Sequence, residues 1–263
     1  MLISMTQASV LITGASSGLG AALARNYAAP GLSLWLGGRD AARLERVALA
    51  CRAKGAQVEC RPLDVTDRDA MEHWILDADR QRPLSLVIAN AGISGGTGNR
   101  LGETAAQTRA IFAANLDGVL NSVLPAIPLM KSRRCGQIAL MASLAGFRGF
   151  PSAPAYAASK GAVRLWGEGL RGWLAEDGVG VSVVCPGFVE TNMTAGNRFP
   201  MPLLLSADRA AAIIRAGIDA NQARIAFPRR LAALVWLLAA LPPAWTDTLL
   251  ARVPRKQSIN NPV

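Results

Sequence analysis

Tyr156 and Lys160 have the spacing of two side chains on one face of a helix, because they lie four residues apart. An ammonium group beside a phenol stabilises the phenolate and lowers the tyrosine pKa from about 10 toward neutrality. Such a tyrosine can pass a proton to or from a carbonyl or alcohol oxygen. The pair alone is common on solvated helix faces. Ser143 could hydrogen-bond the same oxygen, although by itself it reads equally well as a turn or N-cap serine.

A glycine-rich turn follows the first apolar run of the chain, Val10–Ile12. Its glycines permit a tight turn and a close approach of the backbone to a pyrophosphate, and the next helix offers free N–H groups at its N-terminus. A strand before the turn and a helix after it favour a dinucleotide site over a plain glycine-rich loop. The residues expected at the phosphates are Gly14, Ser16, Ser17, Gly18, Leu19 and Gly20.

The end of the second apolar run indicates which dinucleotide is bound. NAD-selective sites usually place an acid here for the ribose hydroxyls, whereas an arginine meets the 2′-phosphate of NADP. Gly38 leaves room and Arg39 supplies the charge, so we expect NADP(H). Asp40 is either the N-cap of a helix that begins at Ala41, which we favour, or a ribose ligand.

Seven short apolar runs alternate with helix-like sequence along most of the chain. This alternation predicts an α/β fold with a parallel sheet covered on both faces. A hydrophobic fraction of 51% and a charged fraction of 17% exclude intrinsic disorder. The expected strands lie at about 10–12, 32–36, 57–62, 84–89, 137–141, 180–185 and 224–227.

The last part of the chain, residues 229–263, differs from the rest. Residues 231–241 carry no polar side chain, Pro242 and Pro243 interrupt them, and a partly apolar helix resumes over 245–253. Eleven helical residues span about half of a bilayer core, so a transmembrane helix is not expected. We therefore divide the chain into a catalytic domain, 1–228, and a helical extension. The extension either covers its own domain or a partner subunit, which we favour, or contacts a membrane surface through 229–256.

The net charge of +10 attracts anions of any kind, including nucleic acid, acidic lipid headgroups and a phosphorylated cofactor. Without a basic run or a clustered aromatic platform, we expect no nucleic-acid binding. Four scattered cysteines and one histidine predict reduced core thiols and no metal site. The N-terminus lacks the pattern of a signal peptide, so we expect a cytoplasmic protein, with the extension allowing peripheral contact at the inner face of a membrane.

In their order and spacing these motifs resemble the short-chain dehydrogenase/reductase family over about residues 8 to 228. The resemblance implies a Rossmann-like, doubly wound parallel sheet of about seven strands, here with a C-terminal apolar helical extension. It also implies hydride transfer between a nicotinamide ring and a carbonyl/alcohol pair. The motifs that carry it are Thr13–Gly20, Asp64, Asn90-Ala91-Gly92, Asn115, Ser143, Tyr156 with Lys160, and Pro186-Gly187 with Thr191.

The resemblance also implies a role for each catalytic residue. Tyr156 is the general acid in reduction and the base in oxidation, and Lys160 lowers its pKa and holds the nicotinamide ribose. Ser143 polarises the substrate oxygen. Asn115 holds a water that links Lys160 to solvent; without the family it would be a mid-helix asparagine among apolar neighbours.

For the rest of the cofactor, the resemblance implies contacts that follow successive strands. Asp64, with Val65 next to it, meets the adenine, and Asn90, Ala91 and Gly92 pack against its ribose. After the sixth strand come Pro186 and Gly187, and then Val189 and Thr191 hold the carboxamide. The sequence departs from the family pattern at Ala89 and Ala142, but neither departure removes a group that the mechanism needs.

The substrate and the partners are less sharply indicated. The loop after Thr191 is apolar and, in this family, would lie over the site, which favours a lipophilic substrate; its residues could equally pack on the domain. The family commonly pairs through the helices that here bear Asn115 and Tyr156, so we expect a homodimer. Two alternatives are an NAD-linked alcohol dehydrogenase and a non-catalytic NADP-binding sensor or scaffold. The loop residues are Met193, Phe199, Met201, Pro202, Leu203, Leu204 and Leu205.

Overall fold

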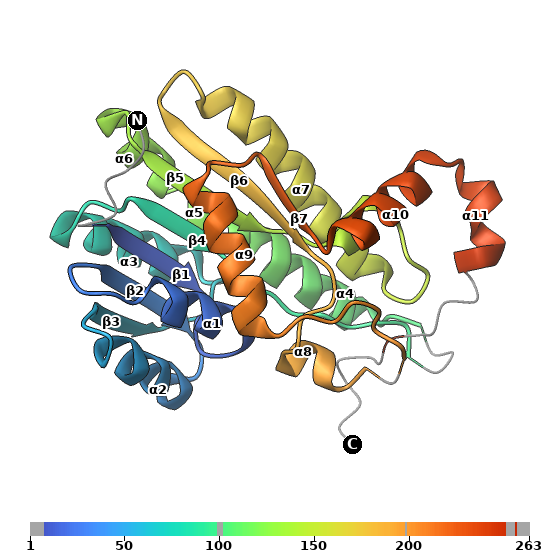
Figure 1. Ribbon diagram of the computed structural model, residues 1–263, viewed down its shortest axis with the longest axis horizontal. Coiled ribbons are helices and arrows are strands. Elements are labelled where there is room, and N and C mark those ends of the chain that lie inside the picture. The colour runs from blue at the N-terminus through green and yellow to red at the C-terminus, as the bar shows by residue number, and fades with distance from the viewer. Residues whose placement is uncertain (1–7, 99–101, 198, 251–255, 257–263) are drawn as a thin grey trace.

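Seven parallel strands form one sheet in the order β3-β2-β1-β4-β5-β6-β7 (Figure 1). The computed structural model describes residues 8–98, 102–197, 199–250 and 256. The strands are β1 (Ser9–Thr13), β2 (Ser33–Gly38), β3 (Gln57–Pro62), β4 (Leu86–Ala89), β5 (Gly136–Met141), β6 (Val179–Pro186) and β7 (Arg224–Phe227).

Helices connect successive strands and cover both faces of the sheet. The helices are α1 (Gly18–Tyr27), α2 (Ala41–Arg52), α3 (Arg68–Gln81), α4 (Ala105–Phe112), α5 (Gly118–Val123), α6 (Ala126–Arg133), α7 (Pro154–Leu174), α8 (Asn192–Ala195), α9 (Ala207–Asp219), α10 (Arg229–Ala240) and α11 (Pro243–Leu250). A π-helix, η2 (Ala113–Asp117), joins α4 to α5, and a 3-10 helix, η3 (Leu144–Phe147), follows β5.

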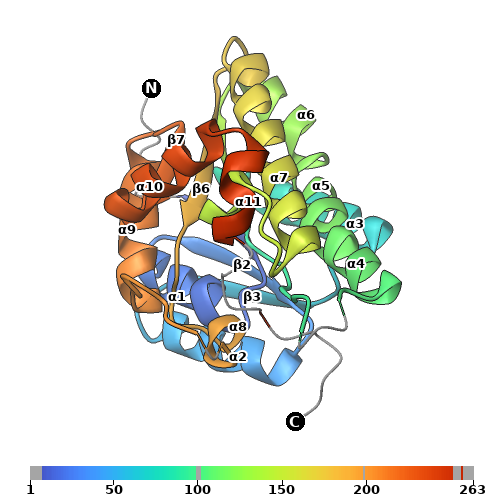
Figure 2. The same ribbon diagram turned by 90° about the vertical axis from the view of Figure 1, so that its right-hand side faces the viewer.

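The alternation of side chains along each strand divides the core into two layers. On β1, Ile12 packs with α1, α2 and α9, whereas its neighbour Leu11 packs with α3, α5, α6 and α7. Figure 2 shows these two groups of helices on opposite sides of the sheet. Because both faces are covered, the central strands are apolar along their whole length, as the sequence predicted.

Each of the seven predicted strands is present, within about two residues of its expected bounds. β3 differs in character, because it is an edge strand and four of its six side chains are exposed. All four cysteines are free, but the prediction that they are core residues is wrong for Cys135, which is exposed, and only partly right for Cys60.

The strand order reverses between β1 and β4, so the chain leaves these two neighbouring strands toward opposite faces of the sheet. In open parallel sheets, ligands bind outside the carboxyl ends of the strands at this point. The glycine-rich turn follows β1 and the segment Asn90–Gly92 follows β4, so both lie at this edge.

The C-terminal extension begins as a helix directly after β7. α10 packs against β7 and η3, and it extends with α11 from one end of the sheet (Figure 1). Val235 is buried, but Leu234, Trp236 and Leu237 are exposed. The predicted second helix starts earlier than expected, at Pro243, and residues 251–253 lie outside the described part of the chain.

One helical stretch, Ala105–Arg133, is long and apolar enough to cross a bilayer by length and composition. Core helices pass the same test. Within this stretch α5 packs on α3 and α4 packs on α7.

Candidate active site

The turn between β1 and α1 has the backbone that the sequence predicted. Gly14 and Gly18 have φ angles of 66° and 54°, a region that favours glycine. A Cβ on Gly20 would lie 2.2 Å from the backbone oxygen of Gly14, so only glycine lets the helix approach the strand. Ser17 is the N-cap residue of α1 and its hydroxyl makes no capping bond. The first N–H groups of α1 therefore face the cavity edge, where they can bind a phosphate.

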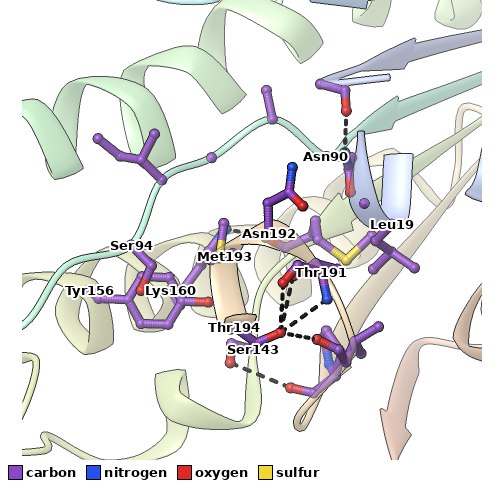
Figure 3. Close-up of a pocket in the computed structure, with 18 of the residues that line it drawn as sticks. Leu19, Asn90, Ser94, Ser143, Tyr156, Lys160, Thr191, Asn192, Met193 and Thr194 are labelled. Carbon is purple, nitrogen blue, oxygen red and sulfur yellow. Dashed lines mark hydrogen bonds between the residues drawn. The ribbon is translucent and has the colours of Figure 1, made fainter. Parts of the chain in front are cut away.

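Asn90 joins the end of β4 to this turn. Its backbone N–H donates to Thr13 Oγ1 at 3.1 Å, and its side-chain Nδ2 donates to the Thr13 carbonyl at 2.9 Å (Figure 3). Gly92 lies against Asn115, because a Cβ on Gly92 would be 2.8 Å from Asn115 Oδ1. The segment Asn90–Gly92 thus contacts both the phosphate turn and the helix that carries Asn115.

At the end of β2, Asp40 is the N-cap of α2, as we favoured from the sequence. Its carboxylate accepts hydrogen bonds from the Arg43 backbone N–H at 2.9 Å and from Arg43 Nε at 2.6 Å. These bonds lower the pKa of Asp40. Arg39 lines the cavity with a largely exposed side chain, and its Nη1 lies 3.8 Å from Asp64 Oδ2.

Asp64 also shapes the loop after β3. Its Oδ1 accepts from the backbone N–H and from the hydroxyl of Thr66, both at 2.9 Å. Asp64 and Val65 both line the cavity, next to the turn that follows β1.

Tyr156 and Lys160 lie on α7 and both face the cavity, so the helical spacing predicted from the sequence is confirmed. Lys160 Nζ is 6.0 Å from the centre of the Tyr156 ring and donates to the Met141 carbonyl at 2.8 Å. Burial lowers the pKa of Lys160 to about 8. Burial raises the pKa of Tyr156, and a hydrogen bond with Ser143 opposes that rise. The lowering of the Tyr156 pKa by Lys160 stays a prediction.

Ser143 combines the two roles that its sequence position allowed. It is the N-cap of η3, where its Oγ accepts from the Ala145 N–H at 3.1 Å, and it donates to the Pro186 carbonyl at 3.4 Å. Its hydroxyl also hydrogen-bonds Tyr156. The hydroxyl of Ser143 and the phenol therefore meet at one place in the cavity.

Asn115 is fully buried in the π-helix η2. The wider turn carries its amide inward toward the loop after β4. Its Oδ1 accepts from the Ile93 N–H at 2.8 Å, and its Nδ2 donates to the Ile93 carbonyl and to Ser159 Oγ, each at 3.0 Å. Asn115 thus ties this loop to α7. The water link to Lys160 stays a prediction.

The residues after β6 close the other side of the cavity. Pro186, Gly187, Val189 and Thr191 all line it. Thr191 caps the short helix α8 together with Thr194, and its methyl group lies 3.1 Å from the position of a Cβ on Gly18. In Figure 3, Asn90 and Leu19 lie toward one end of the cavity, and Tyr156 and Ser143 lie toward the other.

These elements enclose one elongated cavity of about 1020 Å³. Part of the apolar loop lines it through Met193, Phe199 and Pro202. Leu203 and Leu204 are exposed instead, and Leu205 packs against the core, so the predicted lid is smaller than expected. Further apolar lining comes from Leu144, Phe150, Leu231 and Val235.

Three polar residues that the sequence analysis did not place in the site also line the cavity, namely Arg43, Ser94 and Lys256. Arg43 and Ser94 follow closely on predicted site residues, so proximity in the chain was an available signal. Lys256 had no such signal, because it lies beyond the last helix and reaches the cavity only through the fold.

The sequence from residue 8 to residue 200 matches the family model for short chain dehydrogenase. A relative from Myxococcus xanthus, named only as an oxidoreductase, is 36% identical over 95% of this chain and 98% of its own length. This chain therefore belongs to the short-chain dehydrogenase/reductase family, and it is an oxidoreductase.

Two solved structures extend the likeness over nearly the whole chain. A short-chain dehydrogenase from Sphingobium yanoikuyae in complex with NADPH is 26% identical, with a TM-score of 0.79 over 96% of this chain and 99% of that one. A family member from Burkholderia phymatum in complex with NAD is 25% identical, with a TM-score of 0.82 over 99% of each chain. The Rossmann-like fold is thereby confirmed, and a nicotinamide dinucleotide is the cofactor class.

The residues of this chain fit such a cofactor. Gly14, Gly18, Gly20 and Gly38 leave a cradle that a Cβ would fill or strain, at the N-terminus of a helix. The cavity runs from this cradle to Tyr156, so one elongated ligand can reach both.

Proposed function

We propose that this enzyme is an NADP(H)-dependent carbonyl reductase, or the reverse alcohol dehydrogenase, that uses Tyr156 as its general acid/base. The observation that carries the proposal is that Ser143, Tyr156 and Lys160 line the same cavity as the glycine cradle. When bound, the dinucleotide supplies the hydride. The chain must then bind the substrate carbonyl, orient it and supply a proton to its oxygen.

Each catalytic side chain has a part in that proton transfer. Ser143 and Tyr156 donate hydrogen bonds to the substrate oxygen, which polarises the carbonyl. The phenol proton moves to that oxygen as negative charge develops there. Lys160, held near the phenol by the Met141 carbonyl, stabilises the phenolate that remains and binds the ribose hydroxyls. Asn115 holds the loop after β4 against α7 and, through a water, connects Lys160 to solvent.

The cofactor contacts follow the order of the strands. The cradle Gly14–Gly20 with Ser16, Ser17 and Leu19 holds the pyrophosphate. Asp64 and Val65 hold the adenine, and Asn90, Ala91 and Gly92 its ribose. Pro186, Gly187, Val189 and Thr191 hold the carboxamide, and all of these residues line the cavity.

NADP(H) is favoured over NAD(H) by the charges at the end of β2. Asp40 is engaged by Arg43, so its carboxylate is occupied as a helix cap. Arg39 and Arg43 both line the cavity there, and an arginine is the usual partner of a 2′-phosphate.

A lipophilic substrate is favoured by the far wall of the cavity. Met193, Phe199 and Pro202 from one side, and Leu231 and Val235 from α10, present apolar surface to it. Burial of that surface by a substrate is favourable in proportion to the apolar area covered.

The test is a reductive screen of long-chain and aromatic ketones and aldehydes, with NADPH and NADH in parallel. We expect NADPH oxidation that requires the carbonyl and that falls at least 100-fold in Tyr156→Phe. Turnover with NADH alone would favour an NAD-linked alcohol dehydrogenase. Tight NADPH binding without turnover of any carbonyl or alcohol would favour the sensor or scaffold.

For the assembly we propose a homodimer through the helices α4–α6 and α7. Exposed apolar side chains on this side support it, namely Leu124, Leu165 and Trp173. Light scattering coupled to size exclusion should give twice the chain mass, and Leu165→Glu should shift the mass toward that of one chain.

For residues 229–263 we propose a covering role, since Leu231 and Val235 of α10 close the apolar end of the cavity. The opposite side of α10 carries Leu234, Trp236 and Leu237, which a membrane surface would contact. Co-sedimentation with anionic liposomes, for the wild type and Trp236→Gln, tests that contact. We place the enzyme in the cytoplasm, where its free thiols would stay reduced.

A further inference from the structure

Lys256 reaches the substrate end of the cavity from the C-terminal part of the chain. Its backbone carbonyl accepts a hydrogen bond from the Gly98 N–H at 2.9 Å. A Cβ on Gly96 would lie 2.5 Å from Lys256 Cβ, so the missing side chain of Gly96 makes room for the lysine. These two contacts with the loop after β4 fix where the side chain of Lys256 begins.

The Lys256 ammonium lies beside the proposed proton donor. Nζ donates to Ser94 Oγ at 2.8 Å and is 5.7 Å from the centre of the Tyr156 ring. Lys160, at 6.0 Å from the same ring, is already bonded to the Met141 carbonyl. The cavity therefore holds two ammonium groups near Tyr156, and only one of them has an assigned role.

The charge of Lys256 is not neutralised by the part of the chain that the structure describes. No carboxylate among those residues lies within 4.0 Å of its Nζ. Burial lowers its pKa to about 8, so the group is still mostly charged at neutral pH. A buried cation without a counter-ion is costly, and an anionic ligand would remove that cost.

We infer that Lys256 binds the carboxylate of the substrate, and that the enzyme reduces a keto acid with an apolar chain. This inference rests on the proposed function and adds the substrate class to it. Because the ammonium lies so near the Tyr156 ring, the carboxylate must be only a few bonds from the reacting carbonyl. The rest of the substrate then extends along Met193, Phe199 and Val235.

The reaction is balanced with the carboxylate as a spectator. The hydride is added to the carbonyl carbon and the Tyr156 proton to its oxygen, so the keto acid becomes a hydroxy acid and the reduced cofactor is oxidised. Lys256 stays protonated throughout. Its contribution is to bind and orient the substrate, and Ser94 positions its ammonium.

The test compares each keto acid with its own methyl ester, which keeps the carbonyl and the chain but loses the charge. For the wild type we expect kcat/KM to be higher for the acid than for the ester. In Lys256→Met the ratio of the two values should fall about 10- to 100-fold, mainly through KM, which is the range for a charge-assisted hydrogen bond. Lys256→Arg should restore part of it. Lys54→Met, a surface lysine that bonds the Arg25 carbonyl, is the matched control.

A second readout does not depend on turnover. Saturated alkyl carboxylates without a carbonyl should bind the NADPH complex of the wild type and of Tyr156→Phe, but much more weakly that of Lys256→Met. Equal kcat/KM ratios in wild type and Lys256→Met would overturn the inference. So would a shift in the pH profile for esters in Lys256→Met, since Lys256 would then act on Tyr156. If the carboxylates bind through Lys256 but no carbonyl is reduced, the proposed function fails and the anion site stands.

Discussion

The Asp40 carboxylate accepts two hydrogen bonds from one residue, Arg43, through its backbone N–H and its Nε. The first bond caps α2, and the second holds a guanidinium at the rim of the cavity. An acid that the sequence left open as a ribose ligand is thereby used to begin a helix. The neighbouring Arg39 remains largely exposed, with Asp64 3.8 Å away as its ion-pair partner.

Arg39→Ala should weaken NADPH binding about 10- to 100-fold, because it removes a charge-assisted contact to the 2′-phosphate. NADH lacks that phosphate, so its Kd should change by less than about threefold. Fluorescence titration with both cofactors measures the two constants. An equal effect on NADPH and NADH would contradict a phosphate-binding role, and Asp40→Asn is the control for the neighbouring cap.

The pH dependence of reduction should follow Lys160. Its pKa of about 8 means that the ammonium is present below that pH and is lost above it. Because the pKa of Tyr156 is raised, the phenol stays protonated through the same range. For a neutral ketone, kcat/KM should be level below about pH 8 and fall above it.

In Lys160→Arg the guanidinium keeps its charge, so the fall should move to higher pH even if the rate is lower throughout. Since the pKa of Lys256 is also about 8, the profile is repeated in Lys256→Met. A fall near pH 8 that persists in Lys160→Arg but disappears in Lys256→Met would assign it to the wrong lysine for this account.

Gly20→Ala should damage both stability and cofactor binding. The new methyl group would lie 2.2 Å from the Gly14 carbonyl and 2.6 Å from Asn90 Nδ2, so the turn must move. We expect a loss of about 3 kcal/mol in the free energy of unfolding. Gly169→Ala on α7 is the matched control, because nothing lies within 4 Å of its Cβ position. It should be neutral or stabilising by about 0.5–1 kcal/mol.

Asp79→Ala should destabilise the fold away from the active site. Asp79 is nearly buried, forms two hydrogen bonds with Arg133 at 2.7 and 2.9 Å, and accepts from the Leu84 N–H at 2.8 Å. Its loss leaves a guanidinium and an N–H unpaired, for about 3 kcal/mol. Glu45→Ala, which breaks an exposed pair with Arg52, should cost less than about 1 kcal/mol. Urea unfolding compares the two, and similar losses would refute the distinction.

The sheet was predictable from the sequence because both of its faces are covered. A strand that is buried on both faces reads as a short apolar run, and six of the seven strands are of this kind or close to it. The glycine turn and the Tyr156/Lys160 pair were predictable for a related reason, since both are local patterns on one turn or one helix.

Other features depend on contacts between distant segments. No local pattern predicts that Asn115 sits in a π-helix, because its amide is held by Ile93 and Ser159. Likewise, Leu203 and Leu204 are as apolar as Phe199, yet only Phe199 faces the cavity. Lys256 lies 162 residues from Ser94 in the chain, and their hydrogen bond exists only because α10 and α11 lead the chain back to the site.

The most direct test of the central claim follows the hydride itself. NADPH deuterated at C4 of the nicotinamide is mixed with enzyme and a ketone that the enzyme accepts, and a single turnover is analysed by mass spectrometry and NMR. We predict that the deuterium appears at the carbinol carbon, and that Tyr156→Phe still binds NADPH but transfers the label at least 100 times more slowly. Absence of label in the product, or equal rates in the two proteins, would contradict the account.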